Sequence, residues 1–400
     1  MDIIQHTFLG PSGLSRAGQE FFRLLTKDKI RVIPRWLRLN PEDIQYVDAK
    51  LAEEMIKASS FFPMVGQDYC QFFVGTPNNI PMMTNRKLGI ASIVQEAPSL
   101  NAEQAQCLRM FDVVLPPSTF CRSAYLSSGI NPKNVFLVPY PLNIEKWHPK
   151  VKPLQNNKDD VFRFLFMNTP FERKGIDLLI QAFLTEFKRG EPVELSIKTY
   201  QEHRAVNPRH VVSEIANRNR LKFSLSAPVR IYDEALNDER LPAFMKSFDT
   251  LVSPHRSEGF GMNVWYAMAL GIPVVCTNYG GTMDFAKQDF AWLVDLRGYS
   301  NPSPKEYQLF PNLRGIVWGE PDLESLKRQM RACFKDSQAR KQKAEAGAIF
   351  VKENFCDDVI AKLFKDALEK KRPGTWDQLT SLNIKVPPKM LDGQAIMLEV

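Results

Sequence analysis

Short apolar runs and segments of helical periodicity alternate along most of the chain. In the first part, strand-like runs lie at residues 3–4, 30–33, 71–74, 91–94, 113–115 and 135–138. Helical spacing fits residues 17–25 and 49–56. Because strands separated by helices are typical of parallel sheets with crossover connections, this pattern predicts an α/β fold.

A second series of the same kind begins with the apolar run at 161–167. Further strand-like runs follow at 195–198, 229–231, 250–252, 273–275 and 292–294. Two helices are predicted from apolar stripes, one made by Ile176, Leu179, Ile180, Phe183 and Phe187, the other by Ile360, Leu363, Phe364 and Leu368. The second part of the chain therefore repeats the α/β pattern of the first.

The polar segment 147–158 separates the two series, since it contains two prolines and no periodicity. We expect a domain at 1–147, a linker at 148–160 and a second domain at 161–350. Residues 351–400 are expected to form a helix that crosses back to the first domain, and a tail after Pro373. A length of 400 residues suits two domains. The predicted fold class is α/β, with two doubly wound parallel sheets facing each other across a cleft.

Composition limits the cellular setting and the partners. The chain is 44% hydrophobic and 24% charged, as in globular proteins, and it contains no apolar run near the roughly 20 residues that span a bilayer. Its start resembles a strand rather than a signal peptide, so we expect a cytoplasmic protein. The net charge of +7 comes from scattered residues, so no nucleic-acid partner is expected. That charge is compatible with weak peripheral association at the cytoplasmic face of a membrane, although a solvated basic surface is the favoured explanation.

Cysteine and histidine spacing gives no sign of a metal centre. The six cysteines are widely separated, with no Cys-x-x-Cys pair and no histidine at zinc-binding spacing. The five histidines form no evident pair. We therefore expect reduced, structural thiols and no bound metal.

Two segments carry the candidate chemistry. The first runs from Ser257 to Gly271 and combines a carboxylate at Glu258, two early glycines and the start of an apolar helix. Strand-like runs flank it, and the N–H groups at the start of such a helix can bind a phosphate or a sugar. Alone, however, the glycines would be explained by a tight turn before a helix.

The second segment is Arg173-Lys174-Gly175, which lies between a strand and an amphipathic helix. Both cations are therefore expected at the carboxyl edge of a parallel sheet, where doubly wound sheets bind their ligands. A phosphate-binding role and a solvated pair of surface cations are equally compatible with this pair taken alone.

Together, the two segments resemble the signature of the retaining family-4 glycosyltransferases. The stretch from Phe171 to Phe183 resembles the opening of that family's C-terminal domain, and Glu258-Gly259-Phe260-Gly261 resembles the start of its Glu-x7-Glu motif. The resemblance implies the GT-B fold, in which two Rossmann-like domains face across a cleft. It also implies transfer of a hexosyl group from a UDP- or GDP-linked sugar to a carbohydrate or lipid-linked acceptor. The family needs neither a metal nor a cofactor beyond this nucleotide-sugar donor.

The resemblance assigns roles to individual residues of this sequence. The catalytic candidates are Glu258, which would contact the transferred sugar, and Lys174 and Arg173, which would bind the donor diphosphate. The donor-binding candidates are Gly259, Phe260, Gly261, Met262, Tyr266, Gly280 and Gly281. The last two would also fit a simple strand-to-helix turn.

The first domain supplies candidates for the acceptor and diphosphate loop. Gly13 and Arg16 lie in the loop after the first strand, where relatives shape the acceptor site. Glu96 lies where many relatives have a functional histidine, and contact with a sugar and capping of the following segment are both open for it. The missing histidine agrees with a mechanism in which the leaving phosphate takes the acceptor proton.

Two departures from the family pattern affect the donor. The second glutamate of the motif is replaced by Tyr266, and Thr169 stands where the commoner pattern has an arginine. A carboxylate accepts two hydroxyls of the ribose with charge assistance, whereas a phenol offers one neutral group. Tyr266 should therefore bind the ribose diol differently, or pack elsewhere and leave the diol to other groups.

The departures also motivate two alternative functions. One is a catalytically impaired pseudoenzyme of the same fold that binds carbohydrate or nucleotide. The other is a sugar phosphorylase, although phosphorylases of this fold usually retain the glutamate that Tyr266 replaces. Both alternatives rank below the glycosyltransferase.

Overall fold

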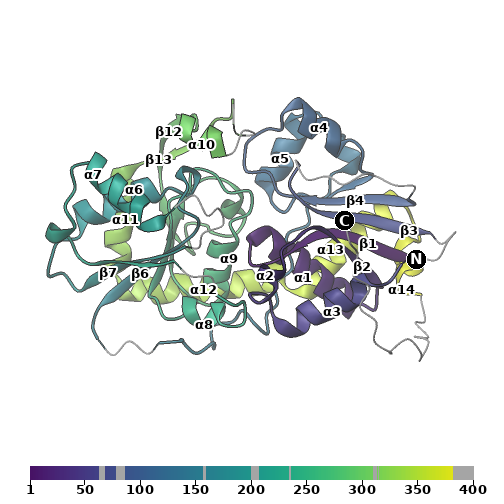
Figure 1. The fold of residues 1–400 in the computed structure, drawn as a ribbon, viewed down its shortest axis with the longest axis horizontal. Coiled ribbons are helices and arrows are strands. Elements are labelled where there is room, and N and C mark those ends of the chain that lie inside the picture. Colours follow the sequence, from purple (N-terminus) through teal and green to yellow (C-terminus); the bar gives the residue numbers. More distant parts are fainter. Residues whose placement is uncertain are drawn as a thin grey trace.

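The computed structural model describes residues 1–62, 68–77, 86–155, 159–199, 207–233, 236–309, 313 and 315–381. Positions 156–158 of the predicted linker and the predicted tail beyond 381 lie outside these residues. The described chain forms two lobes, each built around a parallel sheet (Figure 1).

The first lobe contains a parallel sheet with the strand order β2-β1-β3-β4-β5. Its strands are β1 (Asp2–Leu9), β2 (Val32–Leu39), β3 (Tyr69–Gly75), β4 (Leu88–Ile93) and β5 (Val113–Val114). Its helices are α1 (Gly13–Lys27), α2 (Pro41–Ile44), α3 (Ala49–Ser59), α4 (Ala102–Leu108) and α5 (Thr119–Ser127). The central strands β3 and β4 are buried on both faces, which explains their nearly continuous apolar character.

The second lobe contains a parallel sheet with the order β11-β10-β9-β6-β7-β8. Its strands are β6 (Phe162–Met167), β7 (Val193–Lys198), β8 (Val229–Tyr232), β9 (Thr250–Ser253), β10 (Val274–Thr277) and β11 (Trp292–Val294). Its helices are α6 (Ile176–Glu186), α7 (Pro208–Arg218), α8 (Leu241–Met245), α9 (Met262–Ala269), α10 (Pro304–Leu309), α11 (Leu323–Lys335) and α12 (Ser337–Phe355). An antiparallel pair, β12 (Leu296–Ser300) and β13 (Trp318–Pro321), extends this lobe.

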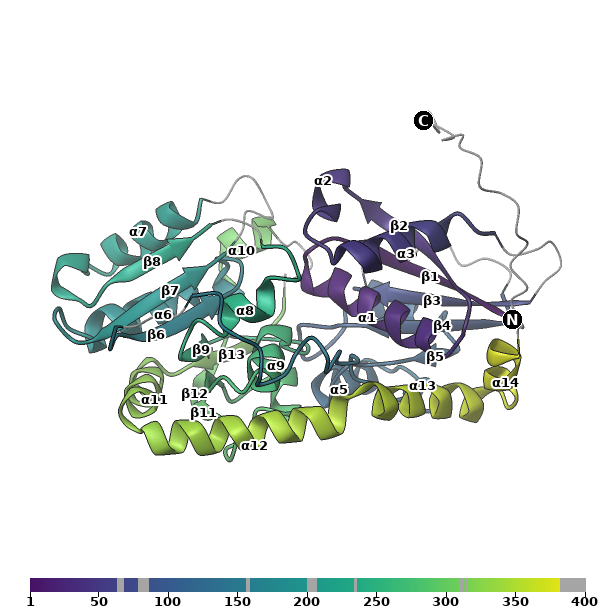
Figure 2. The ribbon, with the colours of Figure 1, turned by 90° about the horizontal axis from the view of Figure 1, so that it is seen from below.

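The C-terminal helices connect the two lobes. Figure 2 shows α12 running below the second lobe and α13 (Asp357–Lys371) continuing below the first, followed by α14 (Thr375–Thr380). Arg23 of α1 binds Asp357 through two hydrogen bonds of 2.7 and 2.6 Å. At the junction of the two helices, the N–H of Leu142 donates to the carbonyl of Phe355. The chain therefore passes between the lobes twice, and the two crossings are in contact.

Two expected strands differ from the structure. Residues 135–138 do not form a strand, and only Val135 makes an isolated bridge, to Val114. The expected strand at 30–33 begins instead at Val32 and extends to Leu39. It contains Pro34, which is tolerated because β2 lies at the edge of its sheet.

Aromatic side chains join the linker and the first lobe to helix α9. The rings of Tyr140 and Phe260 meet edge to face with centroids 4.9 Å apart. The rings of Trp147 and Tyr266 stack with centroids 3.7 Å apart and planes 7° apart. All four side chains are buried, so the apolar core is continuous between the lobes at this point.

Arg256 holds together three parts of the second lobe. Its guanidinium is 4% exposed and binds both carboxylate oxygens of Asp177 in α6 and both of Glu320 in β13, at 2.8–2.9 Å. It also donates to the carbonyl of Glu172. These contacts raise the pKa of the guanidinium against the effect of burial, so Arg256 is a permanent cation between two carboxylates.

We expect Arg256→Met to lower the free energy of unfolding by about 3–5 kcal/mol, because it leaves two carboxylates without their buried partner. Chemical denaturation followed by circular dichroism measures this loss. Arg328→Met is the control, since the Arg328–Asp295 pair is 64% exposed on both sides and should contribute less than about 1 kcal/mol. Equal losses in the two variants would contradict the structural role of Arg256.

Candidate functional site

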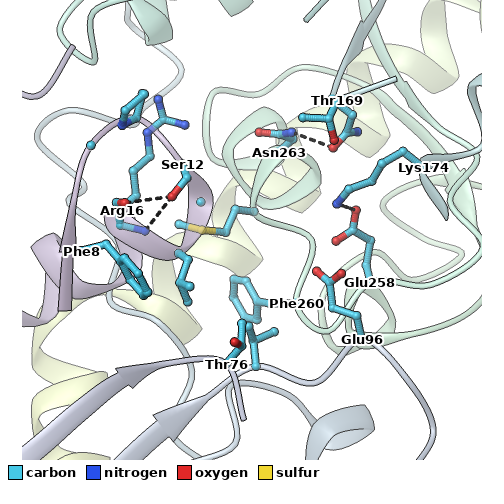
Figure 3. A pocket seen from close by; sticks show the side chains of 18 of the residues that line it. Phe8, Ser12, Arg16, Thr76, Glu96, Thr169, Lys174, Glu258, Phe260 and Asn263 are labelled. Atoms are coloured by element: carbon cyan, nitrogen blue, oxygen red, sulfur yellow. Dashed lines mark hydrogen bonds and ion pairs between the residues drawn. The ribbon is translucent and has the colours of Figure 1, made fainter. Parts of the chain in front are cut away.

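A cavity of about 1390 Å³ lies between the lobes, at the carboxyl ends of strands from both sheets. From the first lobe it is lined by residues 8–16 and 94–97, and from the second by residues 167–169, 198–199 and 260–264. Figure 3 shows Arg16 and Ser12 on one side of this space and Lys174, Glu258 and Asn263 on the other. The cavity is therefore bounded by the segments that sequence patterns had marked as candidate sites.

Gly261 sets the position of Glu258. It has φ of 88° and directly precedes α9, and a Cβ atom there would lie 2.3 Å from Cγ2 of Thr282. Only glycine tolerates this conformation and this contact. The chain can therefore turn sharply after β9, which leaves the Glu258 carboxylate at the cavity.

Gly175 brings the two cations to that carboxylate. It has φ of 74°, and a Cβ atom there would lie 1.8 Å from the carbonyl oxygen of Pro254. The turn after β6 therefore packs directly on the chain after β9, and the N–H of Arg256 donates to the carbonyl of Arg173 at 2.8 Å. This close packing places Nζ of Lys174 2.5 Å from Oε1 of Glu258.

Lys174, Arg173, Glu258 and Glu96 form one network of charged groups at the cavity. Arg173 binds Glu96 of the first lobe, lies 3.8 Å from Oε2 of Glu258 and donates to the carbonyl of Ser257. Burial alone would raise the pKa of Glu258, but Lys174 and Arg173 lower it to about 2. Glu258 is therefore an ionised, buried hydrogen-bond acceptor at neutral pH.

His255 supports the loop behind Glu258. Its ring lies between the carbonyl oxygens of Ser253 and Tyr279, each 3.0 Å from a ring nitrogen. Burial lowers its pKa, so the ring is neutral at pH 7 and donates to one of these two carbonyls. It does not line the cavity.

Gly13 and Arg16, which the sequence analysis placed in a loop, lie in the first turn of α1 and line the cavity. Ser12 caps α1 through the N–H of Ser15, which fixes the loop. Arg16 binds Asp238 of the second lobe, with 2.7 Å from Nε to Oδ1. Asp238 is 222 positions away along the chain, so no local sequence pattern indicated this partner.

The contacts between the lobes lie on both sides of the cavity. On one side, Ser118 donates to the carbonyl of Gly259 at 2.5 Å and the N–H of Thr119 donates to Asp284. On the other side, the N–H of Asp238 donates to the carbonyl of Tyr46. These contacts would break if the lobes separated.

Three of the predicted donor-binding glycines lie behind the site. A Cβ at Gly259 would lie 2.4 Å from Val94, and one at Gly280 or Gly281 would lie 2.7 or 2.1 Å from the carbonyl oxygens of Glu258 or Gly259. None of the three lines the cavity. The structure explains these glycines by close packing of backbones, whereas Phe260, Gly261 and Met262 do line the cavity.

Tyr266 also lies outside the cavity. Its side chain is 1% exposed and stacks on Trp147, and burial raises the pKa of its phenol well above the usual value. Of the two expectations for this residue, the structure agrees with packing elsewhere, and it does not place the phenol where it could bind a ribose at the cavity.

Lys198, Thr199 and Asn263 line the cavity but were not predicted as site residues. Asn263 donates to the carbonyl of Met167, next to the turn that carries Lys174. Lys198 and Thr199 lie at the end of β7, so their place after a buried parallel strand was the signal that could have identified them.

The part of the chain that the structure describes contains neither a metal-binding cluster nor a membrane-spanning helix. There, no group of three His, Cys, Asp or Glu side chains is arranged to hold a metal ion. No described helix is both long and apolar enough to cross a membrane.

Comparison with solved structures confirms the predicted GT-B fold. HepE of Anabaena, solved in complex with UDP and glucose, matches with a TM-score of 0.64 and 13% identity over 92% of this chain and 99% of HepE. Sucrose-phosphate synthase of Thermosynechococcus elongatus matches with a TM-score of 0.67 and 15% identity over 95% of this chain and all of that one (100%). At such identities the similarity establishes the fold alone.

Sequence comparison gives the family. A stretch of 112 residues is 32% identical to the O-antigen biosynthesis glycosyltransferase WclY of Escherichia coli, covering 27% of this chain and 26% of WclY. The chain thus matches about a quarter of that relative's length. The family model described as glycosyl transferases group 1 matches residues 149–348, which is half of the 400 residues. The chain therefore belongs to the glycosyl transferases group 1 family.

Proposed function

We propose that this glycosyltransferase moves a hexosyl group from a UDP- or GDP-linked sugar to a carbohydrate or lipid-linked acceptor, with retention of configuration and without a metal ion. The observation that carries the proposal is the buried, ionised Glu258 beside two cations at the cavity. Membership of the group 1 family supports the reaction class. HepE, of similar fold, was solved with UDP and glucose, which favours a uridine nucleotide.

In this proposal the second lobe, near residues 161–350, binds the donor. Glu258 accepts hydrogen bonds from hydroxyls of the transferred sugar, since a carboxylate has acceptor positions beyond the one used by Lys174. Lys174 and Arg173 stabilise the negative charge that develops on the leaving diphosphate. The first lobe, near residues 1–147, binds the acceptor beside Glu96 and the loop at Gly13.

The proposed reaction takes place on one face of the sugar. The bond from the anomeric carbon to the β-phosphate oxygen breaks, and the acceptor oxygen forms its bond to the same carbon on the same face. The acceptor proton passes to the departing phosphate oxygen. This route needs no protein base, in agreement with the neutral His255 turned away from the cavity.

The proposal includes weak association with an anionic membrane surface when the acceptor is lipid-linked. The net charge of +7 supports this part of it. Enclosure of the cavity by contacts between the lobes would exclude water and limit hydrolysis of the donor.

Donor turnover tests the proposal directly. The protein is incubated with UDP-glucose, UDP-galactose, UDP-N-acetylglucosamine or GDP-mannose and a panel of saccharide acceptors, and the anomeric coupling of the product is read by proton NMR. We expect turnover of one donor, an axial product linkage from an axial donor linkage, and no change in rate with EDTA. An inverted product or a metal requirement would contradict the mechanism, and nucleotide binding without any turnover would favour the pseudoenzyme.

We expect Glu258→Gln to lower kcat by about 10²–10³-fold, a loss typical of removing one preorganised polar group at a reacting centre. The amide keeps the size of the side chain but removes the charge next to Lys174. Steady-state kinetics measure the change, and Glu324→Gln is the control because Glu324 is 66% exposed on α11. An unchanged kcat in Glu258→Gln would remove this residue from the mechanism.

We expect Tyr266→Phe to bind UDP with the affinity of the parent, because the phenol does not line the cavity and its ring stacks on Trp147. Tyr266→Ala should lower the free energy of unfolding by about 3–5 kcal/mol, as loss of a large buried ring does. Calorimetric titration and thermal unfolding measure the two effects. A tenfold weaker affinity in Tyr266→Phe would return Tyr266 to the donor site.

A further inference from the structure

Exposed cations gather where α7 ends, at the side of the second lobe that points away from the first (Figures 1 and 2). They come from the turn between α6 and β7 and from the end of α7 with the segment after it: Lys188, Arg189, Arg218, Arg220 and Lys222. The N–H of Arg189 donates to the carbonyl of Leu225 at 3.1 Å, and Lys188 forms an antiparallel bridge with Ser226. The two segments therefore lie side by side. We call the five cations, together with Phe223 and Leu225, the distal patch.

Neighbouring carboxylates do not neutralise the cations of the distal patch. The glutamates closest to them along the chain are bound to other cations, Glu186 and Glu191 to Arg331, Glu194 to Arg230 and Glu214 to Lys305. Within the described residues, none of the five cations has a carboxylate at ion-pair distance. The distal patch is therefore a local excess of positive charge on the surface.

Two large apolar side chains project from the same place. They belong to a short 3-10 helix, η3 (Phe223–Leu225), which directly follows Lys222. Phe223 is 42% exposed and Leu225 is 65% exposed. Apolar side chains surrounded by cations are typical of surfaces that bind anionic lipid, because the apolar groups enter the acyl boundary while the cations stay among the headgroups.

The size and charge of the distal patch favour lipid over other partners. It contains seven residues, whereas a stable protein interface uses about 20–30 residues on each side. A second copy of the chain would bring cations against cations. A nucleic acid would use the cations for its phosphates but would leave the exposed Leu225 in water.

Docking through the distal patch would leave the active-site cavity open. The patch precedes β7 and β8 and so lies at the amino ends of these strands. The cavity lies at the carboxyl ends of the same sheet, and no residue of the patch lines it. Substrates could therefore enter the cavity while the protein is attached.

We propose that the distal patch attaches this protein to anionic lipid membranes, with Phe223 and Leu225 inserted and the cations bound to lipid phosphates. The inference goes beyond the proposed function, which includes membrane association without locating it. Attachment through this surface does not depend on which donor or acceptor the enzyme uses.

Co-sedimentation of the full-length protein with vesicles tests the attachment. The probes are vesicles of phosphatidylcholine alone and of phosphatidylcholine mixed with phosphatidylglycerol. We expect binding to the mixed vesicles only, and weaker binding at higher salt, because the cations are exposed to screening.

Two variants separate charge from insertion. The double variant Arg218→Gln/Lys222→Gln should weaken binding to mixed vesicles about 10- to 30-fold, since each cation near an anionic surface contributes about fivefold. Leu225→Ser should weaken it about 5- to 10-fold without changing net charge. Both variants should unfold at the temperature of the parent, because the three side chains are exposed.

Helix α12 offers matched controls on another surface. Lys341→Gln/Lys352→Gln removes the same charge from exposed positions, and Ile349→Ser removes an apolar side chain that is 57% exposed. Both should bind the mixed vesicles like the parent. Donor turnover with a soluble saccharide acceptor should be unchanged in all four variants.

The outcomes distinguish this inference from the proposed function. If the parent turns over a donor but does not bind mixed vesicles, the membrane attachment alone is wrong. If it binds vesicles through the distal patch but turns over no donor, the attachment stands and the proposed function fails. Equal losses in the α12 controls, or full binding by Leu225→Ser, would show attraction by overall charge and overturn the assignment to the distal patch.

Discussion

The ion pair between Lys174 and Glu258 is the interaction on which the arrangement of the site depends. A carboxylate as buried as Glu258 is strongly unfavourable unless cations and hydrogen bonds compensate for its lost hydration. Nζ of Lys174 lies 2.5 Å from Oε1 of Glu258, and this contact keeps the carboxylate ionised. The turns after β6 and β9 must therefore pack closely against each other. Gly175, Gly261 and the ion pairs of Arg256 make this close packing possible.

The two lobes contribute to the site in different ways. Within the second lobe, the loops behind Glu258 are fixed by packing of one backbone on another, as where the N–H of Gly281 donates to the carbonyl of Glu258 at 2.7 Å. The first lobe reaches the site through side-chain ion pairs, Glu96 to Arg173 and Arg16 to Asp238. Side-chain ion pairs exchange partners more easily than packed backbones do. An anion bound in the cavity would compete with Glu96 for Arg173 and with Asp238 for Arg16.

The elements that sequence reasoning identified are those whose signal is local. The strands of both sheets are short apolar runs, and α6 shows a clear stripe, so their positions followed from periodicity. Helix α12 was not predicted, because its buried stripe consists largely of small residues such as Ala344, Gly347 and Ala348, which look unremarkable in sequence. Partners far apart along the chain, such as Arg16 and Asp238, depend on how the lobes pack and have no local signature. The glycines at 259, 280 and 281 were visible as a pattern, but only the structure shows that neighbouring backbones require them.

Tyr266 is a packing residue in this structure. The ring of Tyr266 in α9 stacks on the ring of Trp147, which is the last residue of the predicted first domain. A carboxylate in the same place would be as buried as the phenol of Tyr266, near the charges of Glu20 and Asp238 and of their cationic partners Arg23 and Arg16. Burial disfavours the charged form of a side chain, so this environment favours a neutral one. The stack thus fastens α9 to the chain at Trp147, while Asn263 of the same helix lines the cavity.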